Sequence, residues 1–363
     1  MTIAVSEPLL RPTRQRGDRW TAWRRGLFGS PLNIAITLAF VVLALIVVAP
    51  ALHWALLDAT WGGTAKDCAA RSGACWAFIA EKWRFIVFGL YPSDRDWQAA
   101  LAVALIVGLV IVTGLPRFWC VRLVAAWVVV LGLALAVMGG APTGILVPTD
   151  KWGGLPMTVL LSVIGFAGAF PLGVGLALAR RSDMRVLRWM AIGFIEVMRG
   201  VPLIAVLYVS TLIFPLMLPA GMAIDKLARA QVAIILFVAA YMAEIVRAGL
   251  QSLPSGQYEA SRALGLSWWA MMRLVILPQA LKSVIPAFVN LAIGLFLDTT
   301  LVIVIGLFDF LNTARVATTD ANWNGYHNEA YAFVAIVYFS VSYAASRYSL
   351  WLERRLSASQ GSR

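Results

Sequence analysis

Ionisable residues stand at helical spacing inside otherwise apolar stretches of this chain. Glu244 and Arg247 are three residues apart, as are Glu196 and Arg199, and side chains at that spacing are neighbours on a helix surface. Charged groups are costly at membrane depth, where they serve a pathway, a partner or each other. For these two pairs we favour mutual neutralisation near a helix end over direct contact with a transported molecule.

A third polar group has no such partner. Asp298 is followed directly by Thr299 and Thr300, and Asn290 precedes it by about two helical turns. No Lys or Arg lies within one helical turn of Asp298 in the sequence, so a role in a pathway or at a subunit interface is the better interpretation.

A glycine and a proline lie beside the Glu196 and Arg199 pair. Gly200 and Pro202 predict a break or kink in a helix, because proline lacks the backbone N–H that a helix interior needs. Inside a membrane, the freed backbone groups must be satisfied by protein or by cavity water. A bend at this position serves gating or packing, and the sequence is compatible with both.

The residue patterns of common enzyme sites are missing from the sequence. None of the five Lys residues lies in a G-x-x-x-x-G-K-[ST] loop, so we expect no ATP site of that kind on this chain. His53 and His327 lie far apart and outside any metal-binding pattern, and no Ser, His and Asp form a nucleophile elbow. We therefore expect no catalytic residue, no metal site and no cofactor bound by this chain.

The composition places much of the chain in lipid. Of the 363 residues, 61% are hydrophobic and 13% are charged, and the mean hydropathy is +0.80. A single water-soluble globule of this length does not accommodate such a composition. We expect an all-α membrane protein, because helices satisfy their own backbone hydrogen bonds in lipid. The apolar runs predict eight crossings, at about 33–54, 97–114, 121–138, 155–179, 190–217, 229–249, 284–309 and 329–350.

The net charge of +12 follows membrane topology. Its arginines cluster beside apolar runs, a pattern typical of membrane proteins rather than of a face that binds nucleic acid. Eight crossings put both termini on one side, and 20 of the 30 Lys and Arg residues fall on that side. The positive-inside rule then predicts cytoplasmic termini.

The chain divides into four expected regions. The first three crossings are plain apolar sequences with a long outer loop at 58–96, whereas the last five carry nearly all the polar residues at membrane depth. Cys68 and Cys75 lie in that loop, and their spacing suits a local disulfide and two unlinked thiols about equally. The expected regions are a basic cytoplasmic tail at 1–30, three helices at 31–150, a five-helix core at 151–352 with a cytoplasmic loop at 251–282, and a cytoplasmic tail at 353–363.

The cytoplasmic loop contains the patterned stretch GQYEASRALGLSWWAMMRLVILPQA. Gly265 predicts the end of a short helix that starts near Gly256. Ser267 predicts the N-cap of a second helix, which Leu277 and Pro278 stop. Taken alone, this pattern also suits an amphipathic helix that merely connects two membrane helices. One face of the first helix is expected to combine Tyr258, Ala263 and Leu264.

The same stretch resembles the EAA loop of ABC importer permeases. EASRALG at 259–265, followed by ILP at 276–278, matches that motif in residues and spacing, with Ser261 in place of an alanine. Three further stretches resemble signatures of the polar amino-acid branch, in the same order. They are EVMRGVPLI at 196–204, AYMAEIVRAGLQS at 240–252 and DTTLVIVIGL at 298–307.

The N-terminal part narrows the resemblance. GACWAFI at 73–79 and the three extra helices resemble the M-type permease subunit of general L-amino-acid ABC transporters. The resemblance implies a type I ABC importer permease core in the last five helices, placed in a bacterial inner membrane. It also implies partners: two cytoplasmic ATPase subunits that bind ATP and Mg²⁺, a periplasmic amino-acid-binding protein, and a second permease subunit, a paralogue or a second copy.

The resemblance further implies that the EAA loop is a coupling helix held by an ATPase subunit. A coupling element needs a short rigid helix, small residues for close approach and a polar contact that sets the register. The coupling residues that it implies are Gly256, Tyr258, Glu259, Ala260, Ser261, Ala263, Gly265, Leu277 and Pro278.

For an amino-acid substrate, the resemblance implies a pathway through the core. Asp298 and Thr299 would meet the substrate's ammonium group, and Arg199 or backbone donors would meet its carboxylate. Family members commonly have a Lys where this chain has Leu297, so no role of that Lys carries over. The remaining expected pathway residues are Thr300, Asn290 and Glu244.

Two alternatives belong to other functional classes. A stand-alone secondary transporter needs an ion relay and two related halves with broken helices, and the sequence shows no such repeat. A non-transporting scaffold would recruit a cytoplasmic partner through residues 251–282. The polar residues at membrane depth argue against a scaffold.

Overall fold

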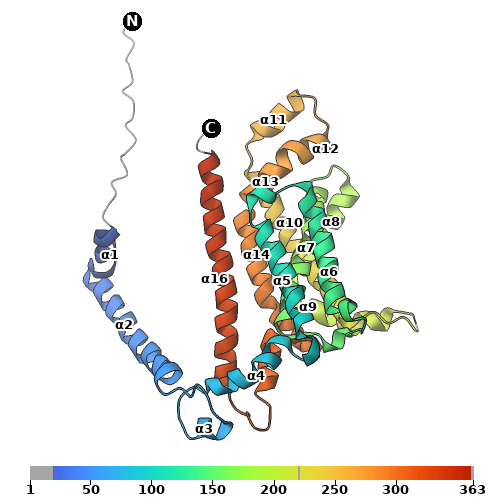
Figure 1. Cartoon of the computed structure of the whole chain (residues 1–363). Helices are drawn as coiled ribbons and strands as arrows, with labels where there is room; N and C mark the ends of the chain where they lie inside the picture. Colours follow the sequence, from blue (N-terminus) through green and yellow to red (C-terminus); the bar gives the residue numbers. More distant parts are fainter. Residues whose placement is uncertain (1–18, 220, 361–363) are drawn as a thin grey trace. The chain divides into compact units, whose positions relative to one another are not determined.

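The protein is almost entirely helical (Figure 1). The computed structural model describes residues 19–219 and 221–360. Two compact units, residues 1–77 and residues 78–363, are described separately. Among the described residues, seven helices are long and apolar enough to cross a membrane, and a bent pair of helices makes an eighth candidate. The expectation of an all-α protein with about eight membrane helices is confirmed.

The first unit contains one long apolar helix. A short basic helix, α1 (Arg19–Phe28), precedes α2 (Pro31–Leu52), which continues through the π-helical turn η1 (His53–Leu57). The Ser30 side chain accepts from the Asn33 backbone N–H, and Pro31 takes the first helical position, where its missing N–H is harmless. These signals start the first predicted crossing.

A disulfide closes the loop after this helix. Cys68, in α3 (Ala65–Ala69), is bonded to Cys75. The Trp76 indole N–H donates to the Ala55 carbonyl at 2.8 Å. The Trp76 ring stacks on the Trp61 ring, with 6.0 Å between the two ring centroids. The disulfide loop is thereby tied to the end of the membrane helix.

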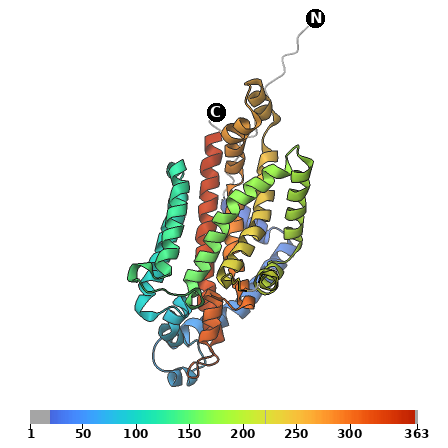
Figure 2. The ribbon, with the colours of Figure 1, turned by 90° about the vertical axis from the view of Figure 1, so that its right-hand side faces the viewer.

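The second unit is a bundle of helices joined by turns and short irregular segments (Figures 1 and 2). In chain order its elements are α4 (Trp76–Phe88), η2 (Ser93–Arg95), α5 (Asp96–Thr113), η3 (Pro116–Phe118), α6 (Val121–Met138), η4 (Ala141–Thr143), η5 (Thr149–Lys151), α7 (Gly154–Arg180), α8 (Arg185–Gly200), α9 (Leu203–Tyr208), η6 (Val209–Ile213), η7 (Phe214–Met217), α10 (Lys226–Ser252), α11 (Ser255–Ala263), α12 (Trp268–Met271), η8 (Met272–Ile276), α13 (Leu277–Ser283), α14 (Ile285–Asp298), η9 (Thr299–Ile305), β1 (Phe308–Asp309), α15 (Phe310–Ala317) and α16 (His327–Gln360).

The bundle's core extends into α5. The buried residues Ala99, Ala102 and Ile106 of α5 belong to the same core as Met157 and Leu161 of α7. By packing, the compact unit therefore begins at Phe78, and the regional boundary at residue 150, drawn from the polarity of the helices, stays a prediction.

The fifth predicted crossing is broken. Helix α8 ends at Gly200 and α9 begins at Leu203, with 105° between the two helices. Val201 and Pro202 between them are extended, with ψ angles of 136° and 143°. The break lies where Gly200 and Pro202 predict one, so a single straight crossing over 190–217 is not formed.

The helix that Ser267 caps continues past Pro278. Helical structure runs through α12, the π-helical turn η8 and α13, and Pro278 lies in the first turn of α13. The wider π turn leaves room for a residue that lacks a backbone N–H. The prediction that Leu277 and Pro278 stop this helix is therefore wrong; the interruption falls at Val284, before α14.

Different elements lie at the two ends of the second unit. Helices α11 and α12 lie at the same end as the C-terminal end of α16 (Figures 1 and 2). At the other end, β1 pairs in parallel with Gly153 and Gly154 at the start of α7. The loop at 251–282 and the C-terminal end of α16 thus share one side, as the eight-crossing topology requires.

Candidate functional site

Helix α11 is a short rigid element with a defined stop. Gly265 has a φ of +70°, in the left-handed region that favours glycine. The Leu266 N–H donates to the Ser261 carbonyl and the Gly265 N–H donates to the Arg262 carbonyl, at 3.2 and 2.9 Å. These two bonds form a Schellman motif. Ser267 then caps α12 by accepting from the Ala270 N–H at 3.3 Å.

One face of α11 carries small residues and a carboxylate into solvent. Glu259, Ala260 and Ala263 are exposed, as are Gly256 and Leu264. Small exposed side chains allow another helix or groove to approach closely, and a single charge can set the register of that contact.

Two of the expected coupling residues turn the other way. Ser261 is only 2% exposed, and its hydroxyl donates to the Gln257 carbonyl at 2.7 Å. Tyr258 packs against the bundle core, whereas Ala263 and Leu264 are exposed. The prediction that these three residues share one face of the helix is therefore wrong. The spacing from Tyr258 to Ala263 is five residues, which separates them around a helix by more than a quarter turn.

Tyr258 connects α11 to two helices of the bundle. Its hydroxyl donates to the Leu250 carbonyl, in the last turn of α10, at 2.8 Å. The Arg181 guanidinium, at the end of α7, donates to the same hydroxyl at 3.2 Å and lies 5.6 Å from the ring centroid. A displacement of α11 therefore acts directly on the ends of α7 and α10.

A cluster of charged side chains joins α7, α8 and α10 close to this connection. Arg180 forms ion pairs with Glu244 and, at 3.3 Å, with Glu196. Glu244 also pairs with Arg247 at 2.8 Å and lies 3.9 Å from Arg199. The Glu244 side chain is 16% exposed, whereas that of Glu196 is 56% exposed. Glu244 is therefore the central anion, shared by three guanidinium groups.

The cluster differs from the two isolated pairs that the sequence predicts. Glu244 and Arg247 do pair, but among the described residues no ion pair links Glu196 to Arg199. Glu196 pairs instead with Arg180 of α7, because the ends of α7, α8 and α10 converge at this point. Arg199 instead lies 5.8 Å from the Tyr241 ring centroid, close to Glu244.

The polar residues of α14 are divided between surface and core. Asp298 and Asn290 are exposed, and they lie two turns apart on one helix. Thr299 is buried, and its hydroxyl donates to the Phe296 carbonyl at 2.8 Å. The Thr300 hydroxyl donates to the Leu297 carbonyl at 2.9 Å. The structure thus presents Asp298 and Asn290 on the surface of α14 but does not bring Thr299 to it.

Comparison with known proteins decides the family. Residues 169–358, just over half of the chain, match the family described as binding-protein-dependent transport system inner membrane component. The chain is also 45% identical to the inner membrane amino-acid ABC transporter permease protein YhdY of Escherichia coli (strain K12), over 97% of both chains. The chain belongs to this family of ABC importer permeases.

Further relatives of the permease differ in length. The permease is 36% identical to the glutamate/glutamine/aspartate/asparagine transport system permease protein BztC of Rhodobacter capsulatus, over 92% of both chains. A crystal structure of an amino acid ABC transporter with histidines covers 56% of the permease and 92% of its own chain, with 32% identity and a TM-score of 0.50. Shorter relatives thus correspond to little more than half of the permease.

Family membership fixes the general role. The permease is a non-catalytic, multi-pass membrane subunit of an importer, which works with ATPase and binding-protein partners. Its last five crossings, from α7 to α16, form the type I importer core. Within residues 19–219 and 221–360, no group of three or more His, Cys, Asp or Glu side chains gathers to hold a metal ion.

Sequence reasoning missed two arginines of the permease. Arg180 and Arg181 were counted only toward topology, yet they hold Glu244 and Tyr258. A signal was present: a pair of arginines ends an apolar run on the same predicted side as the EAA loop. Only the packing of α7 on α10 shows which side chains they meet.

A buried acid at the opposite end of the bundle was also missed. Asp309 is fully buried and caps α15, accepting from the Leu311 and Asn312 N–H groups at 3.0 and 3.2 Å. Burial raises the pKa of Asp309 to about 6, although the backbone hydrogen bonds oppose this shift. The Phe310 N–H donates to the Thr158 hydroxyl at 3.0 Å, which fixes this cap to α7.

Proposed function

We propose that the permease carries amino acids through the bacterial inner membrane as part of an ATP-driven importer. The observation that carries the substrate class is its 45% identity, over nearly its whole length, to a relative named as an amino-acid permease. The second full-length relative is named for acidic amino acids and their amides. Both termini of the permease, and α11, face the cytoplasm in this proposal, which the distribution of Lys and Arg supports.

The partner composition extends this proposal. A second permease subunit, most simply a paralogue, two cytoplasmic ATPase subunits and a periplasmic amino-acid-binding protein complete the importer. ATP and Mg²⁺ are bound by the ATPase subunits. The exposed small residues and Glu259 of α11 support its role as the element that an ATPase subunit holds.

Force on α11 has a short route into the core. Tyr258 passes it to the ends of α7 and α10, and Arg180, next to Arg181 in the chain, passes it through Glu244 and Glu196 to α8. Helix α8 ends at the Gly200 to Pro202 break. A shift of the α7 and α10 ends is thereby coupled to the bend between α8 and α9, which we propose as the gate.

The exposed face of α14 supplies the proposed substrate contact. Asp298 attracts the ammonium group that every α-amino acid carries. Backbone groups freed at Val201 and Pro202, or Arg199, receive the carboxylate. Asn290 extends the polar surface, whereas Thr299 contributes only by holding the helix end.

Reconstitution distinguishes this function from the two alternatives, a secondary transporter and a scaffold. The permease, its paralogue and the ATPase are placed in liposomes, and ATP hydrolysis and amino-acid uptake are measured with and without the loaded binding protein. We expect both to rise only when the loaded binding protein and ATP are present. Uptake driven by an ion gradient without ATP would instead show a secondary transporter. ATPase binding with no uptake of any amino acid would show a scaffold.

A further inference from the structure

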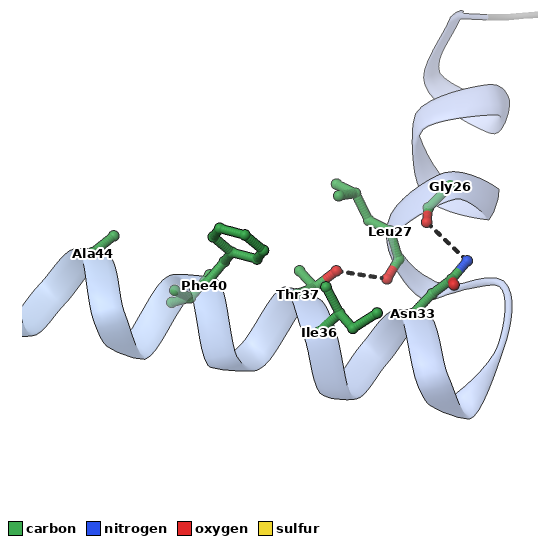
Figure 3. A pocket seen from close by; sticks show the side chains of 8 residues that line it. Gly26, Leu27, Asn33, Ile36, Thr37, Phe40 and Ala44 are labelled. Atoms are coloured by element: carbon green, nitrogen blue, oxygen red, sulfur yellow. Dashed lines mark hydrogen bonds between the residues drawn. The ribbon is translucent and has the colours of Figure 1, made fainter.

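The hollow between α1 and α2 in the first unit is lined by apolar side chains and by two polar side chains that are bonded to α1 (Figure 3). The Asn33 amide donates to the Gly26 carbonyl at 3.0 Å. The Thr37 hydroxyl donates to the Leu27 carbonyl, also at 3.0 Å. This hollow therefore shows no chemistry that would select a ligand. A polar group that lacks a partner lies instead in the core of the second unit.

The Tyr338 hydroxyl of α16 is buried without a hydrogen-bond partner. The residue is 8% exposed, and its hydroxyl oxygen forms no hydrogen bond within the part of the chain that the structure describes. The Tyr338 ring packs against the rings of Phe296 in α14 and Phe310 in α15, at centroid distances of 5.1 and 5.9 Å. These two contacts fix the direction of the hydroxyl. A buried hydroxyl in this situation is rare, because burial removes the water that it would otherwise bond.

Polar groups from three other elements face this hydroxyl. They are the Asp309 carboxylate, which caps α15, and the hydroxyls of Thr158 in α7 and Thr299 in η9. None of these three residues is more than 1% exposed. With Tyr338, they form a closed polar site inside an otherwise apolar core.

The hydrogen bonds already made at this site decide what it can hold. The Thr158 hydroxyl accepts a backbone N–H of α15 at 3.0 Å, so its own O–H is left to donate. The Thr299 O–H donates to a backbone carbonyl of α14 at 2.8 Å, so its oxygen is left to accept. Each carboxylate oxygen of Asp309 accepts one backbone N–H and keeps a further lone pair. Together with the Tyr338 O–H, the site offers two donors and two acceptors.

We propose that one buried water molecule occupies this site and joins α16 to α7, η9 and α15. The water accepts from the Tyr338 and Thr158 hydroxyls. It donates to the Asp309 carboxylate and to the Thr299 oxygen. Two bonds accepted and two donated match the capacity of water, and buried waters typically bond about three otherwise unsatisfied groups. A monovalent cation fits this site less well, because backbone N–H groups at the start of α15 already point at the carboxylate.

Tyr338→Phe tests the site through the sign of its effect on stability. If nothing bonded the hydroxyl, its removal would relieve a buried polar group and stabilise the permease. If a water bonds it, removal breaks that bond and leaves the water short of a partner. We therefore expect the ratio of folded to unfolded permease to fall about fivefold. Denaturant unfolding of the purified full-length permease in detergent at pH 8 measures this ratio.

The matched control is an exposed tyrosine on the same helix. Tyr343→Phe, at a residue that is 54% exposed, should leave the unfolding midpoint unchanged. A midpoint that is unchanged or higher in Tyr338→Phe would overturn the proposal.

Electron cryo-microscopy of the assembled importer distinguishes a bridging water from a direct bond. At a resolution that shows ordered water at other buried sites, we expect a density peak within hydrogen-bond distance of the Tyr338 hydroxyl and the Asp309 carboxylate. A direct bond between these two groups, with no peak, would overturn the proposal. A stabilisation that appears in sodium chloride and is absent in choline chloride would also overturn it, because that result would show a cation in the site.

Discussion

Tyr258 and Arg181 give the proposed coupling helix its mechanical connection. A helix that merely rests on the bundle would move without consequence, whereas the Tyr258 hydroxyl bonds to the end of α10 and receives Arg181 from the end of α7. Its two hydrogen bonds share one oxygen atom. It can therefore be removed without changing the shape of the contact.

Tyr258→Phe should reduce the number of amino-acid molecules transported per ATP hydrolysed. The ring and its contact with Arg181 remain, but the hydrogen bonds of the hydroxyl are lost. A loss of about 1 kcal/mol corresponds to a fall of about fivefold in coupling. Uptake and ATP hydrolysis are measured on the same liposomes. Tyr343→Phe, at an exposed tyrosine of α16, should keep the wild-type ratio. An unchanged ratio in Tyr258→Phe would show that its hydroxyl transmits nothing.

Glu244→Gln should destabilise the permease more than Glu196→Gln. Removing Glu244 leaves three guanidinium groups without their shared anion, and we expect a loss of about 2 kcal/mol in unfolding free energy, below the value for a fully buried pair. Glu196 is largely exposed and should contribute less than about 1 kcal/mol. Thermal unfolding in detergent at low and high salt compares them. Equal losses would mean that Glu244 is not the central anion.

At the scale of elements, local signals could be read from the sequence and remote packing could not. Gly265 and Ser267 act through bonds to residues within five positions, so the end of α11 and the start of α12 follow from the sequence. Pro278 was misread because a π-helical turn beside it is not marked by any residue type. Arg180 was missed because its partners lie on α8 and α10.

The cap of α15 should make the stability of the permease depend on pH. Burial raises the pKa of Asp309 to about 6 from 3.8, so the folded protein binds the proton more tightly than the unfolded chain. The stabilisation is complete below about pH 4 and is lost as pH rises through 6, about 3 kcal/mol in all. Asp309→Asn keeps only one of the two accepting oxygens but does not ionise, so its melting temperature should lack the fall that the wild type shows as pH rises from 4 to 8.

Asp320 has a pKa shifted in the opposite direction to that of Asp309. The hydrogen bond from Lys82 and nearby backbone donors lower the pKa of Asp320, so its contribution is present above the unfolded value and is lost as pH falls. Relative to the wild type, Asp309→Asn should therefore gain stability as pH rises from 4 to 8, whereas the deficit of Asp320→Asn should shrink only as pH falls below about 4, so melting temperatures are measured from pH 2 to pH 8. The same pH slope in Asp309→Asn and the wild type would refute the assignment.

At the scale of the whole molecule, the permease combines a shared core with an additional N-terminal part. Its shorter relatives correspond to little more than half of its length. The number of crossings and the family could be predicted because apolar length and the EAA spacing are properties of the sequence itself. The start of the compact unit at Phe78 depends on α5 packing into the core, which only the structure shows.

The central claim is that α11 joins ATP hydrolysis on a separate subunit to transport through this chain. Stimulation of ATP hydrolysis by the loaded binding protein, measured in liposomes with Glu259→Lys in α11, tests it most directly. Glu353→Lys, an exposed acid at the end of α16, is the matched control. The account predicts that Glu259→Lys loses stimulation and uptake by about tenfold or more, through repulsion at a contact that Glu259 orients, while the control retains both. Wild-type stimulation and uptake in Glu259→Lys would contradict it.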